Sequence, residues 1–422
     1  MQRYETYKDS GVEWIGEIPD RWEVKKLKYG VSVNPSKGGI DKDSDEMAVF
    51  LPMEKVSEDG EIDCSIKKPI SDLYNGFTFF RKNDVIVAKI TPCFENGKGA
   101  LLNELETDIG FGSTEFHVLR AKPEICKQFL YYITKSETFM KVGEAFMSGA
   151  AGQKRVPTDF ISNFPLASPN IEEQTAIANY LDRKTAEIDA LIAQKQRLIE
   201  LYQEEKTAII NQAVTKGIDP NAKLKDSGID WLGEIPVGWE VKKLKHVAIL
   251  KSGNNLTSEN INNGKYPVYG GNGLRGYYDK FTHDGGLVLI GRQGALCGNI
   301  NYAKGKFWAT DHAVVVQPRL NYRNIWLGEM LRAMNLNQYS VAAAQPGLAV
   351  EAICNLSVPY PSIEEQTAIV QHIETETARI DAKIAKTQRI IELQKEYRTA
   401  LISEVVTGKI KVSHLAEKEI TL

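Results

Sequence analysis

Two different segments of this chain each occur twice, in the same order. Residues 8–28 read KDSGVEWIGEIPDRWEVKKLK and residues 225–245 read KDSGIDWLGEIPVGWEVKKLK, with 16 of 21 positions identical. Residues 171–218 and 363–410, which both begin IEEQTAI, share 26 of 48 positions. We call the first pair the signature segments and the second pair the long repeats. Duplication of this extent predicts a pseudo-twofold molecule with two similarly built halves.

The regions between the duplicated segments are unlike each other in sequence and length. They span residues 29–170 and 246–362, which are 142 and 117 residues long. Short apolar runs between glycine-rich turns predict strands at residues 84–88, 115–119, 286–290 and 313–316. Helical patterns follow at residues 127–142 and 323–339. We therefore expect two different α+β globules, and hence two different recognition surfaces, on one duplicated scaffold.

The long repeats have the pattern of extended amphipathic helices. Asn170 and Ser362 stand at the N-cap positions, with Glu173 and Glu365 three residues later, which is the spacing of a capping box. Apolar residues then recur every three or four positions, and Pro and Gly are absent until the last residues. About 45 residues would form a rod of roughly 65–70 Å, and rods of this kind usually pair. The repeats therefore predict an antiparallel coiled coil, rather than two helices in unrelated bundles.

The expected fold class is thus α+β, with two globular domains separated by an antiparallel coiled coil and related by an internal repeat. The first globular domain with its signature segment is expected at residues 1–170, and the first long helix at 171–218. The second globular domain with its signature segment is expected at 219–362, and the second long helix with a C-terminal tail at 363–422.

Composition favours a soluble protein of the cytoplasm. The 422 residues contain 42% hydrophobic and 25% charged side chains, and neither a signal peptide nor a spanning segment is evident. The five cysteines have no C-x-x-C spacing, which argues against a structural zinc site or a disulfide framework. The net charge of −3 does not indicate nucleic-acid binding by itself. The first variable region carries −4 and the second +4, so any DNA contact in the first requires a local concentration of basic groups.

No catalytic constellation is present. A phosphate-binding loop is missing, and Asn34-Pro35 provides only the first half of the Asn-Pro-Pro-aromatic motif of adenine methyltransferases. Pro19-Asp20 imitates a nuclease motif, but the second signature segment has Val237 in place of the aspartate. The six histidines show no metal-ligand spacing. These observations favour a recognition protein or an adaptor over an enzyme.

Each signature segment contains two tryptophans around a Gly-Glu-Ile-Pro turn: Trp14, Trp22, Trp231 and Trp239. Such aromatic side chains could stack on bases. Repeated tryptophans in a duplicated scaffold are more often packing anchors, and we interpret these four as structural.

The chain resembles the specificity subunits of type I restriction–modification systems. The resemblance lies in residues 213–220 (AVTKGIDP), which lead into the second signature segment, and in the Pro-x-x-x-Glu-Gln openings at 169–174 and 361–366. It extends over essentially the whole chain, including the order of its segments.

This resemblance implies that each variable region is a target recognition domain for one half of a bipartite, asymmetric double-stranded DNA sequence. The helices would set the spacer and dock two methyltransferase subunits, which methylate adenine N6 with S-adenosylmethionine. Motor–nuclease subunits would add ATP-dependent cleavage. The chain itself would catalyse nothing and bind no cofactor, since S-adenosylmethionine, ATP and Mg²⁺ would belong to the partner subunits. Its place would be the cytoplasm of a bacterium or archaeon.

Base edges are recognised chiefly by Arg, Lys, Asn and Gln, and phosphates position the protein. We therefore expect DNA contacts from polar loops in the variable regions. The candidates in the first region are Lys89, Thr91, Lys98, Gln153, Lys154 and Arg155. The candidates in the second region are Tyr269, Asn272, Arg275, Tyr277, Arg292, Gln293, Lys304 and Trp308.

An alternative function is a coiled-coil adaptor between proteins that does not bind DNA. Sequence-specific retention of DNA by the chain together with its methyltransferase partner would distinguish the two hypotheses.

Overall fold

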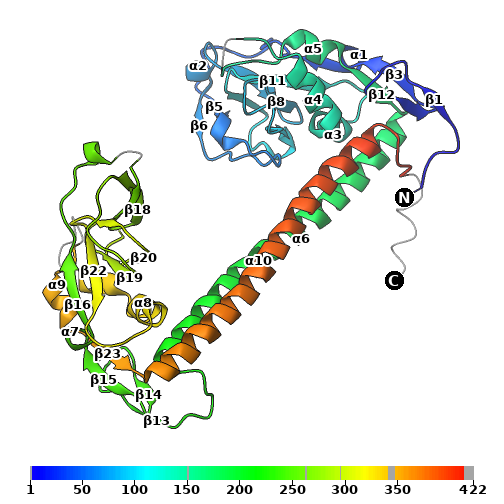
Figure 1. Ribbon diagram of the computed structural model, residues 1–422. Helices are drawn as coiled ribbons and strands as arrows, with labels where there is room; N and C mark the ends of the chain where they lie inside the picture. Colours follow the sequence, from blue (N-terminus) through cyan, green and yellow to red (C-terminus); the bar gives the residue numbers. More distant parts are fainter. Residues whose placement is uncertain (1, 150–151, 262–263, 295, 341–346, 413–422) are drawn as a thin grey trace. The chain divides into compact units, whose positions relative to one another are not determined.

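A computed structural model of the chain describes residues 2–149, 152–261, 264–294, 296–340 and 347–412. Residues 413–422, at the end of the segment expected to contain the second long helix and the C-terminal tail, lie outside the described residues. The chain forms two compact units (Figure 1): unit 1 comprises Met1–Lys195 and Arg389–Leu422, and unit 2 comprises Gln196–Gln388. Each unit therefore contains one variable region and parts of both long repeats.

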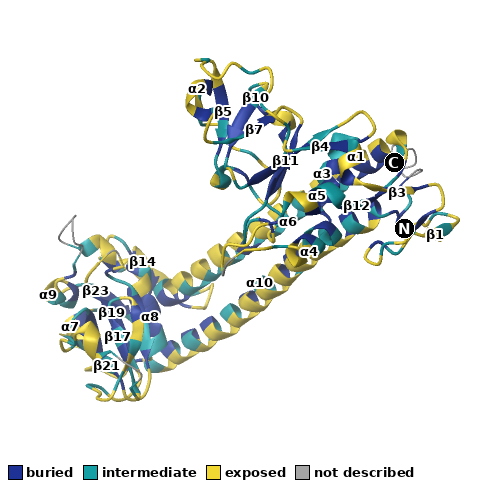
Figure 2. Cartoon of the chain, turned by 90° about the horizontal axis from the view of Figure 1, so that it is seen from above, coloured by how far each residue is buried: buried dark blue, intermediate teal, exposed yellow. Residues whose placement is uncertain are grey.

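The long repeats form two long helices, α6 (Ile171–Lys216) and α10 (Ile363–Val406). Their apolar residues meet along a buried seam, while the opposite faces are exposed (Figure 2). In unit 1 this seam contains Ile177, Leu181, Ile188, Leu401 and Val405. In unit 2 it contains Ile210, Val214, Ile369 and Ile373.

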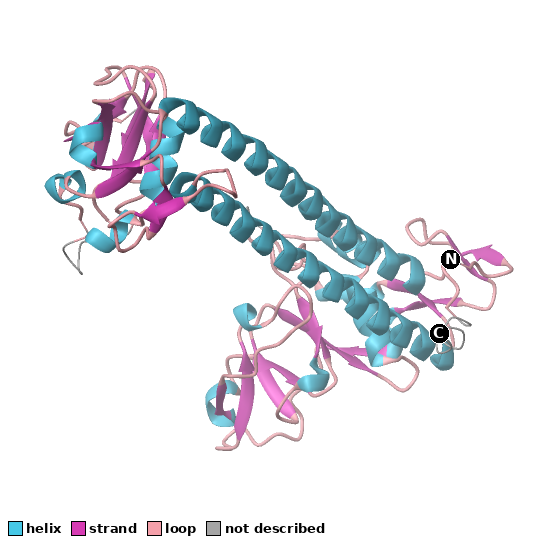
Figure 3. Ribbon diagram, turned by 90° about the horizontal axis from the view of Figure 1, so that it is seen from below, coloured by secondary structure: helices cyan, strands magenta, loops and turns pink. Residues whose placement is uncertain are grey.

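The two helices run antiparallel, as contacts within unit 2 establish. Lys206 Nζ lies 2.7 Å from Asp381 Oδ1. Lys383 Nζ lies 5.2 Å from the centre of the Tyr202 ring. Residue numbers thus fall along α10 as they rise along α6, and Figure 3 shows the helices side by side. The predicted antiparallel pairing is confirmed.

The variable region of unit 1 contains two four-stranded sheets. One has the strand order β4-β11-β8-β9 and the other β6-β5-β10-β7. The first sheet comprises β4 (Val31–Val33), β11 (Phe116–Ala121), β8 (Val85–Ala88) and β9 (Gly99–Leu101). The second comprises β6 (Lys67–Pro69), β5 (Met47–Leu51), β10 (Ile109–Gly112) and β7 (Thr78–Arg81). The short helices are α1 (Leu27–Gly30), α2 (Ile70–Leu73), α3 (Lys127–Lys135), α4 (Glu137–Ala145), α5 (Thr158–Asn163) and the 3₁₀ turns η1 (Met53–Lys55) and η2 (Leu102–Glu104).

Unit 2 repeats the topology of the first of these sheets with a different sequence, and its second sheet has three strands instead of four. Its four-stranded sheet has the order β16-β22-β19-β20, and all its neighbours are antiparallel, as in β4-β11-β8-β9. These strands are β16 (Ala248–Ser252), β22 (Ala313–Pro318), β19 (Leu287–Gly291) and β20 (Ile300–Ala303). A second sheet contains β18 (Gly273–Tyr278), β17 (Tyr266–Gly270) and β21 (Trp308–Ala309). The helices are α7 (Leu244–Val247), α8 (Asn324–Ala333), α9 (Val350–Cys354), η3 (Ser258–Asn260) and η4 (Leu336–Tyr339).

Each signature segment forms a hairpin and then a strand that pairs with the end of the variable region. In unit 1 the hairpin is β1 (Tyr7–Asp9) with β2 (Glu17–Pro19), and β3 (Glu23–Lys26) pairs with β12 (Pro165–Ser168). In unit 2 the equivalents are β13 (Leu224–Asp226), β14 (Glu234–Pro236), β15 (Glu240–Lys243) and β23 (Ser357–Tyr360). Each variable region is therefore closed by its own signature segment just before its long helix begins.

The tryptophans of the signature segments play different parts. Trp22 and Trp239 are each only 1% exposed and anchor the cores of their units, as interpreted from the sequence. Trp231 is partly buried, whereas Trp14 is 43% exposed. Trp14 is thus an exception to the interpretation of the four tryptophans as packing anchors.

The predicted helix at residues 127–142 is in fact two helices, α3 and α4. Ser136 between them has extended backbone angles, and its hydroxyl accepts a hydrogen bond from Phe139 N, which caps the second helix. The predicted helix at 323–339 likewise ends early, because Asn335 adopts a left-handed conformation before η4. Both breaks depend on a residue suited to a cap or turn within an apolar pattern.

Candidate nucleic-acid interface

Five of the six candidates in unit 1 come together at one corner of the β4-β11-β8-β9 sheet. Lys89 directly follows β8; its N–H donates to Glu115 O (2.8 Å), and its carbonyl accepts from Val156 N (2.8 Å). A β-bridge joins Ile90 to Arg155. The segment Lys89–Thr91 therefore lies against the segment that contains Gln153 and Lys154, although about sixty residues separate them in sequence.

Further hydrogen bonds fix this corner. The Thr91 hydroxyl donates to Gly152 O (3.2 Å) and accepts from Lys154 N (3.2 Å), so it holds the loop together. Lys98, the sixth candidate, lies at the same end of the sheet, because its carbonyl accepts from Ala88 N. Its Nζ donates to Met53 O (3.1 Å). Lys98 and Thr91 thus have structural bonds, whereas Gln153 and Lys154 have exposed side chains.

Arg155 forms a two-pronged ion pair with Glu115. Nε and Nη2 of the guanidinium each donate to one carboxylate oxygen at 2.9 Å. The side chains remain 44% and 24% exposed, respectively. The Arg155 guanidinium holds the pKa of Glu115 below its usual value, so Glu115 is ionised at neutral pH. We call Lys89, Glu115 and Arg155 the unit 1 corner.

Unit 2 has a corner of the same geometry. Arg292 directly follows β19; its N–H donates to His312 O (2.9 Å), and its carbonyl accepts from Leu348 N (2.9 Å). Gln293 forms a β-bridge with Gly347. The paired strands also match, since Gly291 faces Ala313 as Ala88 faces Phe116 in unit 1.

These contacts define equivalent positions in the two units. Arg292 takes the place of Lys89, His312 that of Glu115, and Gly347 that of Arg155. We call Arg292, His312 and Gly347 the unit 2 corner. The backbone is therefore the same at both corners while the side chains differ, which is the arrangement that two readers of different sequences require.

The other candidates of unit 2 lie on the sheet β18-β17-β21. Tyr269 is in β17, Arg275 and Tyr277 are in β18, and Trp308 is in β21, which pairs with β17. Asn272 lies in the turn between β17 and β18. This turn packs against the unit 2 corner, since a Cβ added at Gly271 would lie 3.0 Å from His312 O and 3.3 Å from Gln293 O. Asn272, Arg292 and Gln293 are therefore close together.

Lys304 lies away from this cluster. It follows β20, and the register of β20 with β19 places Ala303 opposite Leu287, at the other end of β19 from Arg292. Lys304 lines a pocket of about 400 Å³ together with Lys206 and Ile373 of the long helices. The length of β19 separates Lys304 from the unit 2 corner by about 15 Å. This separation could not be predicted from the sequence.

Three corner residues were not among the candidates: Glu115, His312 and Gly347. Glu115 directly precedes β11 and His312 directly precedes β22, and both of these strands were predicted from the sequence. The sequence signal that could have identified Glu115 and His312 is a polar residue next to the apolar residues of a predicted strand. The link to Lys89 and Arg292 arises only from the pairing of strands.

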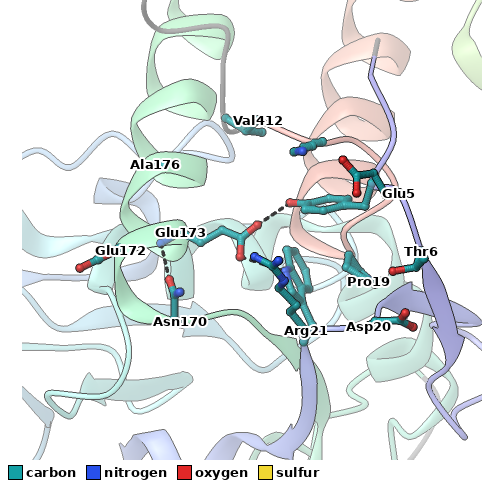
Figure 4. Close-up of a pocket in the computed structure, with 13 residues that line it drawn as sticks. Glu5, Thr6, Pro19, Asp20, Arg21, Asn170, Glu172, Glu173, Ala176 and Val412 are labelled. Carbon is teal, nitrogen blue, oxygen red and sulfur yellow. Dashed lines mark hydrogen bonds between the residues drawn. The ribbon is translucent and has the colours of Figure 1, made fainter.

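A second pocket of about 490 Å³ in unit 1 lies where the first signature segment meets the start of α6 (Figure 4). Glu173 is at its centre: Oε1 accepts from Tyr4 OH (2.7 Å) and Oε2 from Trp22 Nε1 (3.1 Å). The backbone N–H of Glu173 donates to Asn170 Oδ1 (2.8 Å), which is the N-cap bond expected from the sequence. The carboxylate holds the signature segment against the helix, so this site is structural.

Among the described residues no group of three His, Cys, Asp or Glu side chains is placed to hold a metal ion. All five cysteines are free. No described helix is both long and apolar enough to cross a membrane.

Comparison with known proteins reveals clear relatives. Residues 19–201 and 236–394 match the family described as type I restriction modification DNA specificity domain. The chain is 38% identical over 192 residues to the EcoAI specificity subunit of Escherichia coli, covering 44% of this chain and 32% of that protein. It is 42% identical over 167 residues to the EcoprrI specificity subunit of Escherichia coli, covering 36% and 42%. The matches thus span less than half the length of these two relatives.

A longer match is found with an archaeal protein. The MjaVIII specificity subunit of Methanocaldococcus jannaschii is 25% identical over 447 aligned positions, which cover 94% of this chain and 95% of that one.

Two solved structures share the fold. A chain from a study of complex assembly and conformational transition of the type I R-M system has a TM-score of 0.68 at 19% identity, covering 93% of this chain and 99% of that chain. The HsdS subunit from Thermoanaerobacter tengcongensis has a TM-score of 0.57 at 18% identity, covering 93% and 98%. These likenesses agree with the duplicated fold described above. Because the family match extends over both halves, the chain belongs to the type I restriction modification DNA specificity domain family.

Proposed function

We propose that this chain is the DNA-recognition subunit of a type I restriction–modification complex. In this function each unit recognises one half of a bipartite double-stranded target. The observation that supports it best is the pair of equivalent corners, in which one backbone arrangement presents Lys89, Glu115 and Arg155 in unit 1 but Arg292, His312 and Gly347 in unit 2. A repeated frame with different polar side chains suits recognition of two different base sequences.

The candidate contact residues differ in their suitability for contact with DNA in this proposal. Lys89, Arg155 and Arg292 at the corners are candidates for base contacts, with the exposed Gln153 and Lys154 beside them. Arg275, Tyr277 and Trp308 extend the surface of unit 2. Thr91 and Lys98 would act by shaping the unit 1 loop. Lys304 is the least suited of the candidates, because its pocket lies at the opposite end of the sheet.

The paired long helices provide a spacer and a docking surface in this proposal. Their outer faces are exposed and carry charged side chains, which suits contact with further subunits of complementary charge. Those partners would be two methyltransferase subunits and, for cleavage, motor–nuclease subunits. S-adenosylmethionine, ATP and Mg²⁺ would be bound by the partners, and methyl transfer and cleavage would occur there.

The proposal is tested by recovering DNA from a randomised library with the full-length chain and the subunits that co-purify with it. Sequencing of the retained DNA is expected to yield one motif with two specified parts separated by an unspecified spacer. Retention without any sequence preference would contradict the proposal, and so would failure to retain DNA at low salt. The second outcome would favour the protein adaptor.

A further inference from the structure

Arg155 is held in one orientation but still has unused donors. Its side-on contact with Glu115 uses Nε–H and one hydrogen of Nη2. A guanidinium has five N–H groups, so the two hydrogens of Nη1 and the second hydrogen of Nη2 remain. No hydrogen bond from Nη1 to another described residue is present. The outer edge of the guanidinium therefore retains a complete pair of parallel donors on a partly exposed side chain.

Such an edge matches one base edge in duplex DNA. Guanine presents two acceptors, O6 and N7, side by side in the major groove, and the rigid fork of a guanidinium matches both with two parallel N–H groups. A phosphate could also accept two bonds from this edge, but phosphate contact would not depend on sequence. The ion pair matters because it fixes the rotamers of Arg155 before DNA arrives, which reduces the entropy lost on binding.

The unit 2 corner has no such pair. Gly347 stands where unit 1 has Arg155, and His312 stands where it has Glu115. Arg292 replaces Lys89 there, and its guanidinium makes no hydrogen bond or ion pair with another residue in the described part of the chain. Of the two corners, only the unit 1 corner has an arginine oriented by an ion pair, so its effect should appear in only one half of the target.

We propose that Arg155 recognises a guanine in the half-site bound by unit 1, with Glu115 as the positioning residue that orients it. This inference rests on the proposed function and adds to it the identity of one base and of the side chain that selects it. Glu115 also limits binding to other sequences, because its negative charge opposes the approach of DNA phosphate when the guanine contact is not formed.

The structure offers a matched control on β11, the strand that Glu115 directly precedes. Arg120 forms the same side-on fork with Asp84, with Nε and Nη2 at 2.8 and 2.7 Å from the carboxylate oxygens. Arg120 lies toward the other end of β11 from the unit 1 corner, and Asp84 is only 2% exposed. The Arg120 fork is therefore a structural ion pair, and Arg120→Lys perturbs the fold of unit 1 without touching the proposed reading position.

The experiment compares Arg155→Ala, Arg155→Lys and Arg120→Lys in the full-length chain with its co-purified subunits. Library sequencing gives the motif, and titration with the wild-type target and single-base variants gives the discrimination. Both Arg155 variants are expected to lose the preference for guanine at one position of one half-site by about 10- to 100-fold. The Arg155→Lys variant should retain binding to non-specific DNA. Arg120→Lys should lower the unfolding temperature but leave the motif unchanged.

Glu115→Gln tests the positioning role, because it should lower discrimination between base sequences and raise the affinity for non-specific DNA. Discrimination at the guanine should fall, since the amide holds Arg155 less firmly. Affinity for non-specific DNA should rise, and the slope of log K against log salt should steepen by about one unit. A merely structural role for Glu115 would not produce this combination.

The outcomes separate this inference from the proposed function. If the wild-type complex yields a bipartite motif and both Arg155 variants yield the same motif with unchanged discrimination, Arg155 does not read a base. If their affinity falls equally for all sequences, Arg155 contacts phosphate and the inference is overturned. A wild-type complex without any motif would instead refute the proposed function itself.

Discussion

The duplicated contact between a tryptophan and a helix glutamate allows one repeat to serve as the control for the other. In unit 1, Glu173 accepts hydrogen bonds from both Tyr4 and Trp22. In unit 2, Glu365 Oε1 accepts from Trp239 Nε1 at 2.7 Å. The same substitution in the two repeats should therefore have unequal effects.

We predict that Glu173→Ala destabilises the start of α6 more than Glu365→Ala destabilises the start of α10. A hydrogen bond to a charged group contributes about 1.5–3 kcal/mol, and an acidic residue in the first helical turn about 0.3–1 kcal/mol. The contribution of the acidic residue in the first turn and the change in helix propensity are the same in both repeats. Glu173 has one additional charged hydrogen bond, and the loss of this bond costs less than that of a fully buried one because it lies beside a pocket that opens to solvent. The difference should be about 1–2 kcal/mol.

Native-state hydrogen exchange measures this difference locally, so it does not require the two units to unfold together. The relevant amides are those of residues 174–178 in α6 and 366–370 in α10. Tyr4→Phe is the control, because it removes only the additional hydrogen bond. In an otherwise wild-type chain it should destabilise the start of α6 by the same amount as the difference between Glu173→Ala and Glu365→Ala. In a chain that already carries Glu173→Ala it should have little effect. Equal losses of protection in the two repeats would show that the Tyr4 contact contributes nothing, and the reasoning would be wrong.

Two further predictions concern pH and spacing. Burial, together with the nearby positive charge of Arg398, lowers the pKa of Lys135 to about 7, while its Nζ donates to the carbonyls of Glu58 (2.7 Å) and Gly97 (2.6 Å). Between pH 7 and about 10.5 the unfolded chain binds a proton that the folded chain does not, so the stability of unit 1 should rise with pH by up to a few kcal/mol. Hydrogen exchange in unit 1 should show this rise in the wild type and not in Lys135→Met. Insertion of seven residues into both α6 and α10 preserves the apolar stripe and lengthens each helix by about 10 Å. The DNA spacer should then grow by about three base pairs with both half-sites unchanged, and an unchanged spacer in an active complex would exclude the helices as its determinant.

The scaffold was predictable because its signals are local. The spacing of apolar residues and the absence of Pro and Gly identify the long helices, and the N-cap bonds at Asn170 and Ser362 are present as expected. The glutamates of the predicted capping boxes are a partial exception. The carboxylates of Glu173 and Glu365 turn to tryptophans in the signature segments, a contact between residues about 125 to 150 positions apart.

The likeness of the two variable regions could not be read from the sequence. They share a strand order and a corner geometry, but long-range strand pairing creates both. Because neither region repeats the other's residues, the equivalence of Lys89 with Arg292 appears only once backbone partners are known. The ion pair between Glu115 and Arg155 is hidden for the same reason.

The candidate site was predicted as a set of loops rather than as a surface. Selection of polar residues near glycine-rich turns found most of the side chains that the two corners bring together. It also included Lys304, because a turn at the wrong end of a strand has the same composition as one at the right end.

The central claim is that the two units recognise the two half-sites independently, and exchange of one variable region tests it most directly. Residues 29–170 are replaced by the equivalent region of a relative, and methylated adenines are mapped in DNA from cells that contain the resulting complex. The reciprocal control replaces residues 246–362. We expect each exchange to change one half of the motif and to leave the other half unaltered. A change in both halves after either single exchange would contradict the account.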